Sequence, residues 1–564
     1  MGGRYFGLRG TKLNIAIGVI AGLDFLGVMG GLLTLPSFAK TFPEIDTTEE
    51  GQRGLNQSQR DHRATIQGDY HPLRRNSVPK MYHLTVDPGI SVASYNVGCF
   101  LGAIACIWIG DILGRRKTIF LGSTIMVVGA VLQCSAFELS HFIVGRIVTG
   151  IGNGLNTSTV PTWQSECSKS HRRGQLVMIE GALITGGICL SYWLDFGFSF
   201  LEPSTVSWRF PIAFQIIFAL IIMGSVLGLP ESPRWLVLKG REDEAINVLA
   251  ALGDLPPDDP FIHTEFTAIK DTVLELAEVG FKDLFLRNKD RHLHRVVLAY
   301  VNQMFQQISG INLITYYAAT IYEGSIGLSG FLSRILAACN GTEYFIASWI
   351  PVFIVERVGR RPLMLFGAVG MSLSMAVLAI ATSFVHQTKP GIVAAVFLFV
   401  FNTFFAIGWL GMTWLYPAEI VPLRIRAPAN ALATSANWAF NFMVVMITPV
   451  SFSSIGYKTY IIFAVINAFI VPVVYFFYPE TAYRSLEEMD TIFRNTDSIF
   501  SVVRVAQETP RRYGKNGEVL ISYDETEEHH VRAASVGEEK SAALAYNKHH
   551  ANQDYHMENG SSNS

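Results

Sequence analysis

Charged residues are scarce in this sequence. Only 16% of its 564 residues are Asp, Glu, Lys or Arg, whereas 50% are hydrophobic, and the formal net charge is −2. So little charge over such a length is typical of a membrane protein and argues against an ordinary soluble domain. We therefore expect the chain to lie in a lipid bilayer, and we expect no nucleic-acid partner.

Cysteine is scarce too. The six cysteines fall within long apolar runs or in one short loop between two of them, so none is placed to form an external disulfide. None has the spacing of metal ligands. The apolar runs also lack a nucleophile triad or a His, Cys, Asp or Glu cluster. We therefore expect no metal, no cofactor and no enzymatic activity.

Long apolar runs, in contrast, are abundant. A helix that spans a bilayer needs about 20 mostly apolar residues. We predict twelve such spans, at 14–34, 90–109, 118–136, 141–163, 176–196, 210–229, 296–322, 332–355, 362–384, 392–415, 428–450 and 460–478.

A short charged motif occurs twice between these runs, as GDILGRRKTIF at 110–120 and as ERVGRRPLMLF at 356–366. Each copy follows the second span of a set of six, and such internal duplication is typical of transporters built from two related halves. We predict a first half over 1–229 with a long outer loop at 35–89, linker helices over 230–294, a second half over 295–478, and a tail over 479–564 that is mostly disordered.

Lys and Arg concentrate in alternate short loops, including both GRR loops, while the intervening short loops hold almost none. The positive-inside rule places the Arg-rich loops in the cytosol. An even number of spans then places both termini there, in a multi-pass protein of the plasma membrane.

Five ordered motifs point to a family. The two GRR loops, PESPRWL at 230–236, QQISGINLITYY at 306–317 and PETAYRSLEE at 479–488 together resemble the sugar porter family of the major facilitator superfamily. The stretches at 161–174, 180–187, 191–200 and 436–450 look most like fungal glycerol–proton symporters. The resemblance implies an all-α membrane protein with the major facilitator fold, in which 12 transmembrane helices form two pseudo-symmetric six-helix halves with a cytosolic helical layer.

The GRR arginines need carboxylate partners, because cations crowded at a helix end repel one another. Candidate partners lie at matching places in the two halves, and the resemblance implies that they form a cytosolic latch favouring the outward-open state. Solvated positive-inside charges are the alternative. The latch residues are Asp111, Arg115, Arg116, Glu166, Arg173 and Glu231 in the first half, and Glu356, Arg360, Arg361, Glu419, Arg426 and Glu480 in the second.

Asp24 and Arg146 are charged residues that fall inside predicted spans. Asp24 lies in the middle of the first span, where a charge costs about 2.5–3.5 kcal/mol, and Arg146 on the fourth span is the obvious partner. Glycines at 150, 152 and 154 permit close helix approach there. In proton-coupled sugar porters the aspartate at this place is the proton site, which implies symport. A permanently ionised structural pair is the alternative.

A polyhydroxylated substrate calls for amides, which both donate and accept hydrogen bonds. Gln306, Gln307 and Asn312 on the seventh span share one site only if the helix is locally broken, as Ser309-Gly310 permits. The resemblance makes these three residues substrate ligands, together with Trp414, Asn437 and Trp438, although plain packing is the alternative for the tryptophans. It also assigns an outer gate to Tyr316 and Tyr317. Glycine at Gly408 and Gly411 gives the tenth span a flexible segment suited to an inner gate.

Some positions depart from the pattern of hexose carriers. Gly181 replaces a binding glutamine and Tyr344 replaces an asparagine, while Glu180 matches the glycerol symporters and has a role that is either substrate contact or structural capping. These differences favour a small polyol. We predict proton-coupled import of a polyol or sugar, with glycerol favoured. A facilitative hexose uniporter and a non-transporting nutrient sensor are the alternatives.

Overall fold

The structure is a computed structural model of the whole chain. It describes residues 4–23, 35–42, 90–167, 173–260, 262–263, 266–267, 269–270, 281–322, 328–384, 388–422, 425–484 and 486–511, and these contain helices but no strand. The chain divides into two compact units. The larger one comprises Met1–Ala482 with Leu486–Glu508 and holds every feature discussed below.

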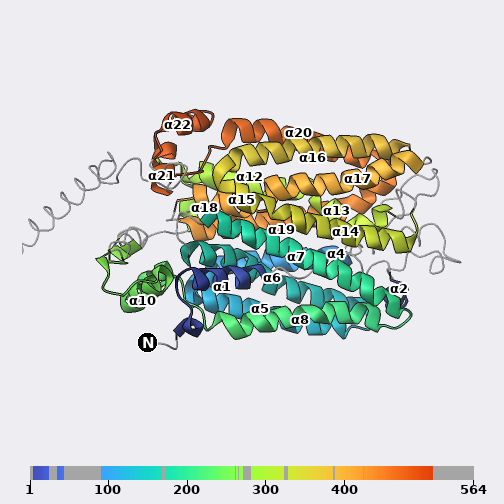
Figure 1. The fold of residues 1–564 in the computed structure, drawn as a ribbon, viewed down its shortest axis with the longest axis horizontal. Coiled ribbons are helices and arrows are strands. Elements are labelled where there is room, and N and C mark those ends of the chain that lie inside the picture. The colour runs from blue at the N-terminus through green and yellow to red at the C-terminus, as the bar shows by residue number, and fades with distance from the viewer. Residues whose placement is uncertain are drawn as a thin grey trace, which may run out of the picture. The chain divides into compact units, whose positions relative to one another are not determined.

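Helices occupy the described parts of all twelve predicted spans. In the first half they are α1 (Gly10–Leu23), α4 (Ile90–Leu113), α5 (Arg115–Cys134), α6 (Leu139–Cys167), α7 (Arg173–Phe198) and α8 (Val206–Val226). A short helix, α2 (Pro36–Thr41), precedes the part of the outer loop that lies outside the described residues. In Figure 1 this set, from blue to green, gathers on one side of the bundle.

The helices of the second half gather on the other side (Figure 1). They are α12 (His292–Ile308), α13 (Ile311–Thr320), α14 (Gly330–Ser348), α15 (Ile350–Val358), α16 (Arg360–Ser383), α17 (Thr388–Phe405), α18 (Met412–Ile420), α19 (Arg426–Ile455) and α20 (Lys458–Phe477). The halves meet where α4 packs on α19 and where α7 packs on α14.

Eight helical segments of the described residues are long and apolar enough to cross a membrane. The other four predicted spans differ for local reasons. α1 is described only as far as Leu23, and α6 carries many glycine, asparagine and threonine residues that lower its hydropathy. The seventh span is broken at Gly310, which has φ +100°, and the eighth changes from α14 to α15 at Trp349.

Glycines let α6 approach its neighbours closely. A Cβ on Gly150 would lie 2.3 Å from the Tyr95 carbonyl oxygen of α4, and one on Gly154 would lie 2.1 Å from that of Cys99. Gly152 faces the opposite side, where a Cβ would lie 2.4 Å from the Gly122 carbonyl oxygen of α5. The three glycines therefore pack α6 between two helices.

A layer of short helices covers one end of the bundle, which we call the linker end (Figure 1). It includes α9 (Pro233–Leu238) and α10 (Glu242–Gly253), whose Trp235 and Leu249 share a buried cluster with Leu13 of α1. On the second half, α21 (Leu486–Arg494) buries Phe493, and α22 (Val502–Glu508) follows it as a helix that the sequence did not predict. The linker and the start of the tail thus each pack on one half.

Candidate functional site

The predicted amide ligands come together at a break between α12 and α13. Gln306 and Gln307 end α12, and Asn312 begins α13 after Gly310, whose left-handed φ favours glycine. The Asn467 side chain of α20 donates to the Ser309 carbonyl oxygen at 2.8 Å, which satisfies a backbone group at the break. The broken helix therefore brings residues five and six positions apart onto one site.

Asn437 of α19 links these amides. Its Nδ2 donates to Gln306 Oε1 at 2.8 Å, and its Oδ1 accepts from Gln307 Nε2 at 2.8 Å. Asn312 Nδ2 in turn donates to Gln307 Oε1. All four side chains are buried, at 8% exposure or less. The amides satisfy one another, and each can exchange a partner for a ligand hydroxyl without losing a hydrogen bond.

A fifth amide, Gln303, belongs to the same cluster and was missed in the sequence. Its Oε1 accepts from Asn437 Nδ2 at 2.6 Å, and its Nε2 donates to the Thr413 carbonyl oxygen at 3.1 Å. The signal that could have found it is spacing, because Gln303 lies three residues before Gln306 on the same helix face.

The cluster also touches an irregular turn in the tenth span. Residues Ala406–Leu410 form a π-helix between α17 and α18, and Gln306 Nε2 donates to the carbonyl oxygens of Trp409 and Leu410, each at 3.2 Å. Such π-helical turns are frequent at functional sites. At Gly408, a Cβ would lie 2.6 Å from the Leu363 carbonyl oxygen, so glycine is required there for close packing on α16.

The two predicted ligand tryptophans lie in different surroundings. Trp438 is 9% exposed; its Nε1 donates to Thr157 Oγ1 of the first half at 3.3 Å, and its ring meets Tyr95 edge to face. Trp414 is partly buried and packs on the core of the second half. Trp438 therefore lies between the halves, and its role as a ligand contact stays a prediction.

The predicted gate tyrosines join three helices. Tyr317 Oη donates to the Val445 carbonyl oxygen of α19 at 3.0 Å, and Tyr316 packs on Ala93 and Val445, from α4 and α19. Nearby, Asn96 Nδ2 of α4 donates to Asn441 Oδ1 of α19 at 2.9 Å. These contacts close the two halves on each other along α4 and α19.

Arg146 is buried in α6 at 4% exposure, with its guanidinium 5.5 Å from the centre of the Tyr95 ring and 6.0 Å from that of Phe142. Its predicted partner Asp24 lies outside the described residues. The proposed pairing of the two therefore stays a prediction.

The positions that depart from hexose carriers lie on the interface between the halves or beside it. Glu180 is buried in α7 at 3% exposure. A Cβ on the adjacent Gly181 would be 3.4 Å from Leu410 Cγ and 3.6 Å from Gly411 Cα of the second half. Tyr344 is buried and meets Phe405 of α17 edge to face.

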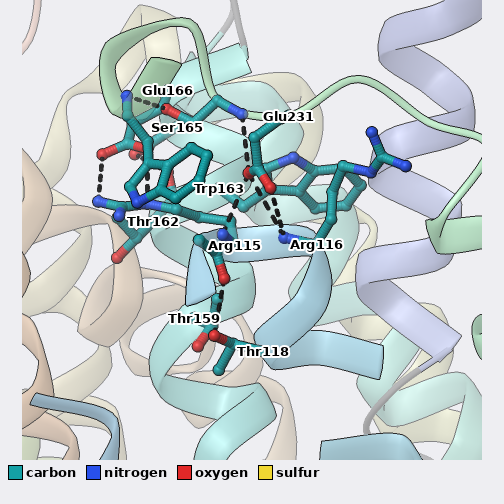
Figure 2. A network of polar contacts seen from close by, with 12 residues as sticks. Arg115, Arg116, Thr118, Thr159, Thr162, Trp163, Ser165, Glu166 and Glu231 are labelled. Carbon is teal, nitrogen blue, oxygen red and sulfur yellow. Dashed lines mark hydrogen bonds and ion pairs between the residues drawn. The ribbon is translucent and has the colours of Figure 1, made fainter. Parts of the chain in front are cut away.

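At the linker end, the first GRR loop is held by two carboxylates (Figure 2). Arg115 Nε and Nη2 donate to the two Glu166 oxygens at 3.1 and 3.2 Å, and Glu231 accepts from the backbone N–H groups of Arg115 and Arg116 at 3.1 and 3.2 Å. Burial opposes ionisation of Glu166, but Arg115 and the Ser232 hydroxyl outweigh it and lower its pKa. Burial raises the pKa of Glu231 despite its backbone hydrogen bonds.

The second half repeats this arrangement, and Glu356 joins it there. Arg360 Nη2 lies 2.7 Å from Glu419 Oε1, and its Nη1 lies 2.7 Å from Glu356 Oε2. Glu480 accepts from the backbone N–H groups of Arg360 and Arg361 at 2.9 and 3.1 Å. Arg115 therefore matches Arg360, Glu166 matches Glu419, and Glu231 matches Glu480.

Other predicted latch residues are placed differently. The guanidinium of Arg116 donates to the carbonyl oxygens of Val226 and Leu227, and Arg361 Nη2 donates to that of Tyr475 at 2.7 Å. These carbonyls lie at helix C-termini, where cations are favoured. Arg426 likewise donates to the Val421 carbonyl oxygen. The side chains of Asp111 and Arg173 lie outside the described residues.

The second charge network also lies against a helix of the first half. Gly174, at the start of α7, lies so close to the second network that a Cβ there would be 2.2 Å from Glu356 Oε1 and 2.6 Å from Arg360 Nη2. A first-half helix therefore rests on the Arg360 cluster at the linker end.

Comparisons with known proteins agree with this architecture. The family described as Sugar (and other) transporter matches residues 14–493. The MFS-type transporter oryC of Aspergillus oryzae is 43% identical over 72% of this chain and 77% of its own length, and Sugar transporter STL1 of Saccharomyces cerevisiae is 37% identical over 95% and 89%. The solved structure of the proton:xylose symporter XylE bound to 6-bromo-6-deoxy-D-glucose has a TM-score of 0.70 at 23% identity, over 85% of this chain and 98% of that one. That likeness shows the fold.

Proposed function

The chain belongs to the sugar (and other) transporter family, a family of membrane transporters and not of enzymes, and from that membership we propose that it imports a small polyol together with a proton. Glycerol is the substrate we favour. Transport proceeds by alternating access, in which one central site opens first to one side of the membrane and then to the other. The site would face the outside and the cytosol in turn, with both termini in the cytosol of a plasma-membrane protein.

The observation that carries the proposal is the buried amide cluster of Gln303, Gln306, Gln307, Asn312 and Asn437. Its members hydrogen-bond to one another directly. Asn437 contacts Gln303, Gln306 and Gln307 at 2.6–2.8 Å, and Gln307 Nε2 donates to Gln306 Oε1 at 3.1 Å. A ligand with few hydroxyls can insert by exchanging these bonds one for one. A hexose needs more of them displaced, and Gly181 offers it no amide from the first half.

Coupling to a proton rests on the charged residues in the spans. Arg146 is buried in α6, where a charge is costly, and Asp24 is its proposed counter-charge and proton site. A solved structure with this fold belongs to a proton:xylose symporter, and we infer proton coupling in this chain by analogy with it. Proton release by Asp24 would strengthen its attraction to Arg146, and so link protonation to the packing of α1 on α6.

The charge networks at the linker end supply the proposed latch. Each network lies within one half, and Gly174 brings the first half against Arg360 and Glu356 of the second. Opening the linker end would pull α7 off this cluster. The contact therefore favours the state in which the linker end is closed.

The test is external pH during substrate addition. Starved cells of a transporter-deficient host that express this chain should alkalinise the medium when glycerol is added, and the Asp24→Asn variant should abolish the signal and uphill accumulation at equal surface expression. Uptake without a pH change and without sensitivity to an uncoupler would instead identify a uniporter. A signal with glucose alone would overturn the polyol assignment, and absence of uptake of either solute would favour a sensor.

A further inference from the structure

A cavity of about 420 Å³ lies along the contact between α7 and α14. Trp193 of α7, Ile350 of α15 and Thr403 of α17 contribute to its wall, together with Thr342, Glu343 and Ile346 of α14. Its volume falls in the range of about 300–1,000 Å³ that is usual for small-molecule sites. Neither the amide cluster nor the charge networks contribute to it.

This cavity opens toward the bilayer. Ile346 is 64% exposed, and Trp193 and Ile350 are each 42% exposed. α7 and α17 belong to segments that are long and apolar enough to cross a membrane. Side chains exposed on such helices face lipid, so a molecule that enters the cavity comes from the membrane.

The polar corner of the cavity lies deep in the membrane. Glu343 follows Gly330, the first residue of α14, by 343 − 330 = 13 residues. At 1.5 Å per residue this places it about 20 Å along the helix, within a hydrocarbon core that is about 30 Å thick. Glu343 is thus an intramembrane carboxyl that the sequence analysis missed.

One oxygen of this carboxyl is paired and the other is not. Thr403 Oγ1 donates to Glu343 Oε1 at 2.5 Å, whereas Oε2 is buried and has no hydrogen-bond partner in the described part of the chain. An ionised carboxylate at this depth costs about 2.5–3.5 kcal/mol. The neutral acid is the cheaper form, and its O–H then needs an acceptor.

The cavity also bridges the two halves. Trp193 Nε1 of α7 donates to Thr342 Oγ1 of α14 at 2.9 Å. About two helical turns further along the same contact, the Thr185 and Ser348 hydroxyls lie 2.8 Å apart. An occupant that touches Trp193 and Ile346 contacts both halves at once. It would therefore respond to their relative movement.

We propose that this cavity binds an uncharged long-chain alcohol from the bilayer. The Glu343 side chain turns its unpaired oxygen toward the cavity and donates to the hydroxyl of the alcohol, whose hydrocarbon chain lies along Trp193, Ile346 and Ile350. A fatty acid would place a second carboxyl against Glu343. The site is separate from the solute pathway and does not depend on which solute is transported.

The experiment uses the full-length protein in lipid nanodiscs with a diazirine-bearing hexadecanol, followed by mapping of the photo-crosslinks. We expect crosslinks on the α7 and α14 peptides that excess hexadecanol removes. Ile346→Trp should reduce them at least about tenfold by filling the cavity. Leu373→Trp is the matched control, because Leu373 is 62% exposed on α16 and does not line the cavity; it should leave labelling unchanged.

Two further variants test the hydrogen bond. Glu343→Gln keeps an N–H donor and should retain labelling within about threefold, whereas Glu343→Leu should lose it. Labelling that is equal in Ile346→Trp and the unchanged protein, or that spreads over all lipid-facing helices, would overturn the site. Displacement by ergosterol but not by hexadecanol would overturn the assignment of the occupant.

Discussion

Replacing Arg360 should lower the free energy of unfolding much more than replacing Arg116, although each is an arginine of a GRR loop. The Arg360 side chain is 5% exposed and pairs with Glu419, which is 11% exposed, and with Glu356. Arg360→Met leaves these carboxylates without their cation, and breaking a buried pair in this way costs about 3–5 kcal/mol. Arg116→Met removes hydrogen bonds to backbone carbonyls at a helix end and should cost about 0.5–1.5 kcal/mol.

A double-mutant cycle identifies the cause. If the loss of stability in Arg360→Met comes from the unpaired Glu419 charge, adding Glu419→Gln to that variant should restore about 1–2 kcal/mol. The glutamine side chain is neutral, and its oxygen can still accept from Thr481 Oγ1, which donates to Glu419 Oε2 at 2.6 Å. The loss of unfolding free energy in the double variant should then be smaller than the sum of the two single-variant losses by at least about 1 kcal/mol.

The assay is a denaturant titration of each purified variant in detergent micelles, together with solute uptake by cells that express equal amounts at the surface. Uptake should fall in Arg360→Met and recover in part in the double variant. Equal losses of stability for Arg360→Met and Arg116→Met, or additive costs in the cycle, would refute the reasoning.

Three further predictions concern other parts of the fold. Gln303→Ala should raise the KM for the transported solute about tenfold with a smaller change in maximal rate, because Asn437 loses one of its acceptors. Initial uptake rates at several solute concentrations measure both constants. An unchanged KM would show that Gln303 does not contribute to the binding site. Gly359→Ala should reduce stability and surface expression more than Gly240→Ala. Both glycines have a positive φ, but only at Gly359 would a Cβ meet a neighbour, Glu480 Oε2 at 2.6 Å. Equal losses in the two variants would mean that this contact is unimportant. Burial, together with the nearby Arg291 and Arg295, lowers the pKa of His294 to about 4. The unfolded chain therefore binds this proton more readily, and the free energy of unfolding should fall as the pH drops from about 6.5 toward 4. The pH dependence of the thermal unfolding temperature over this range should be weaker in His294→Gln, and an unaltered dependence would contradict the assignment.

Much of the fold follows from local patterns. Apolar runs long enough to span a bilayer predicted helices at the right places, and the two GRR loops predicted two related halves because each loop closes the same kind of helix pair. The break at Gly310 was predicted from one glycine and from the need to bring Gln306, Gln307 and Asn312 together. α22 was not predicted, because its seven residues are too few for a periodic pattern to stand out, although Val502 and Ala506 pack on the core of the second half.

The sequence by itself determined which residues fall in apolar runs, which charges cluster at the ends of these runs, and which amides lie near one another on the seventh span, since these depend on composition and spacing along one helix. Only the tertiary structure decided the partners. Arg115 binds a carboxylate 51 positions away while Arg116 next to it binds carbonyl oxygens, and Asn437 joins a glutamine 134 positions away. The cavity beside Glu343 likewise exists only where helices of both halves meet, because packing between distant segments, and not the preference of any one of them, sets those distances.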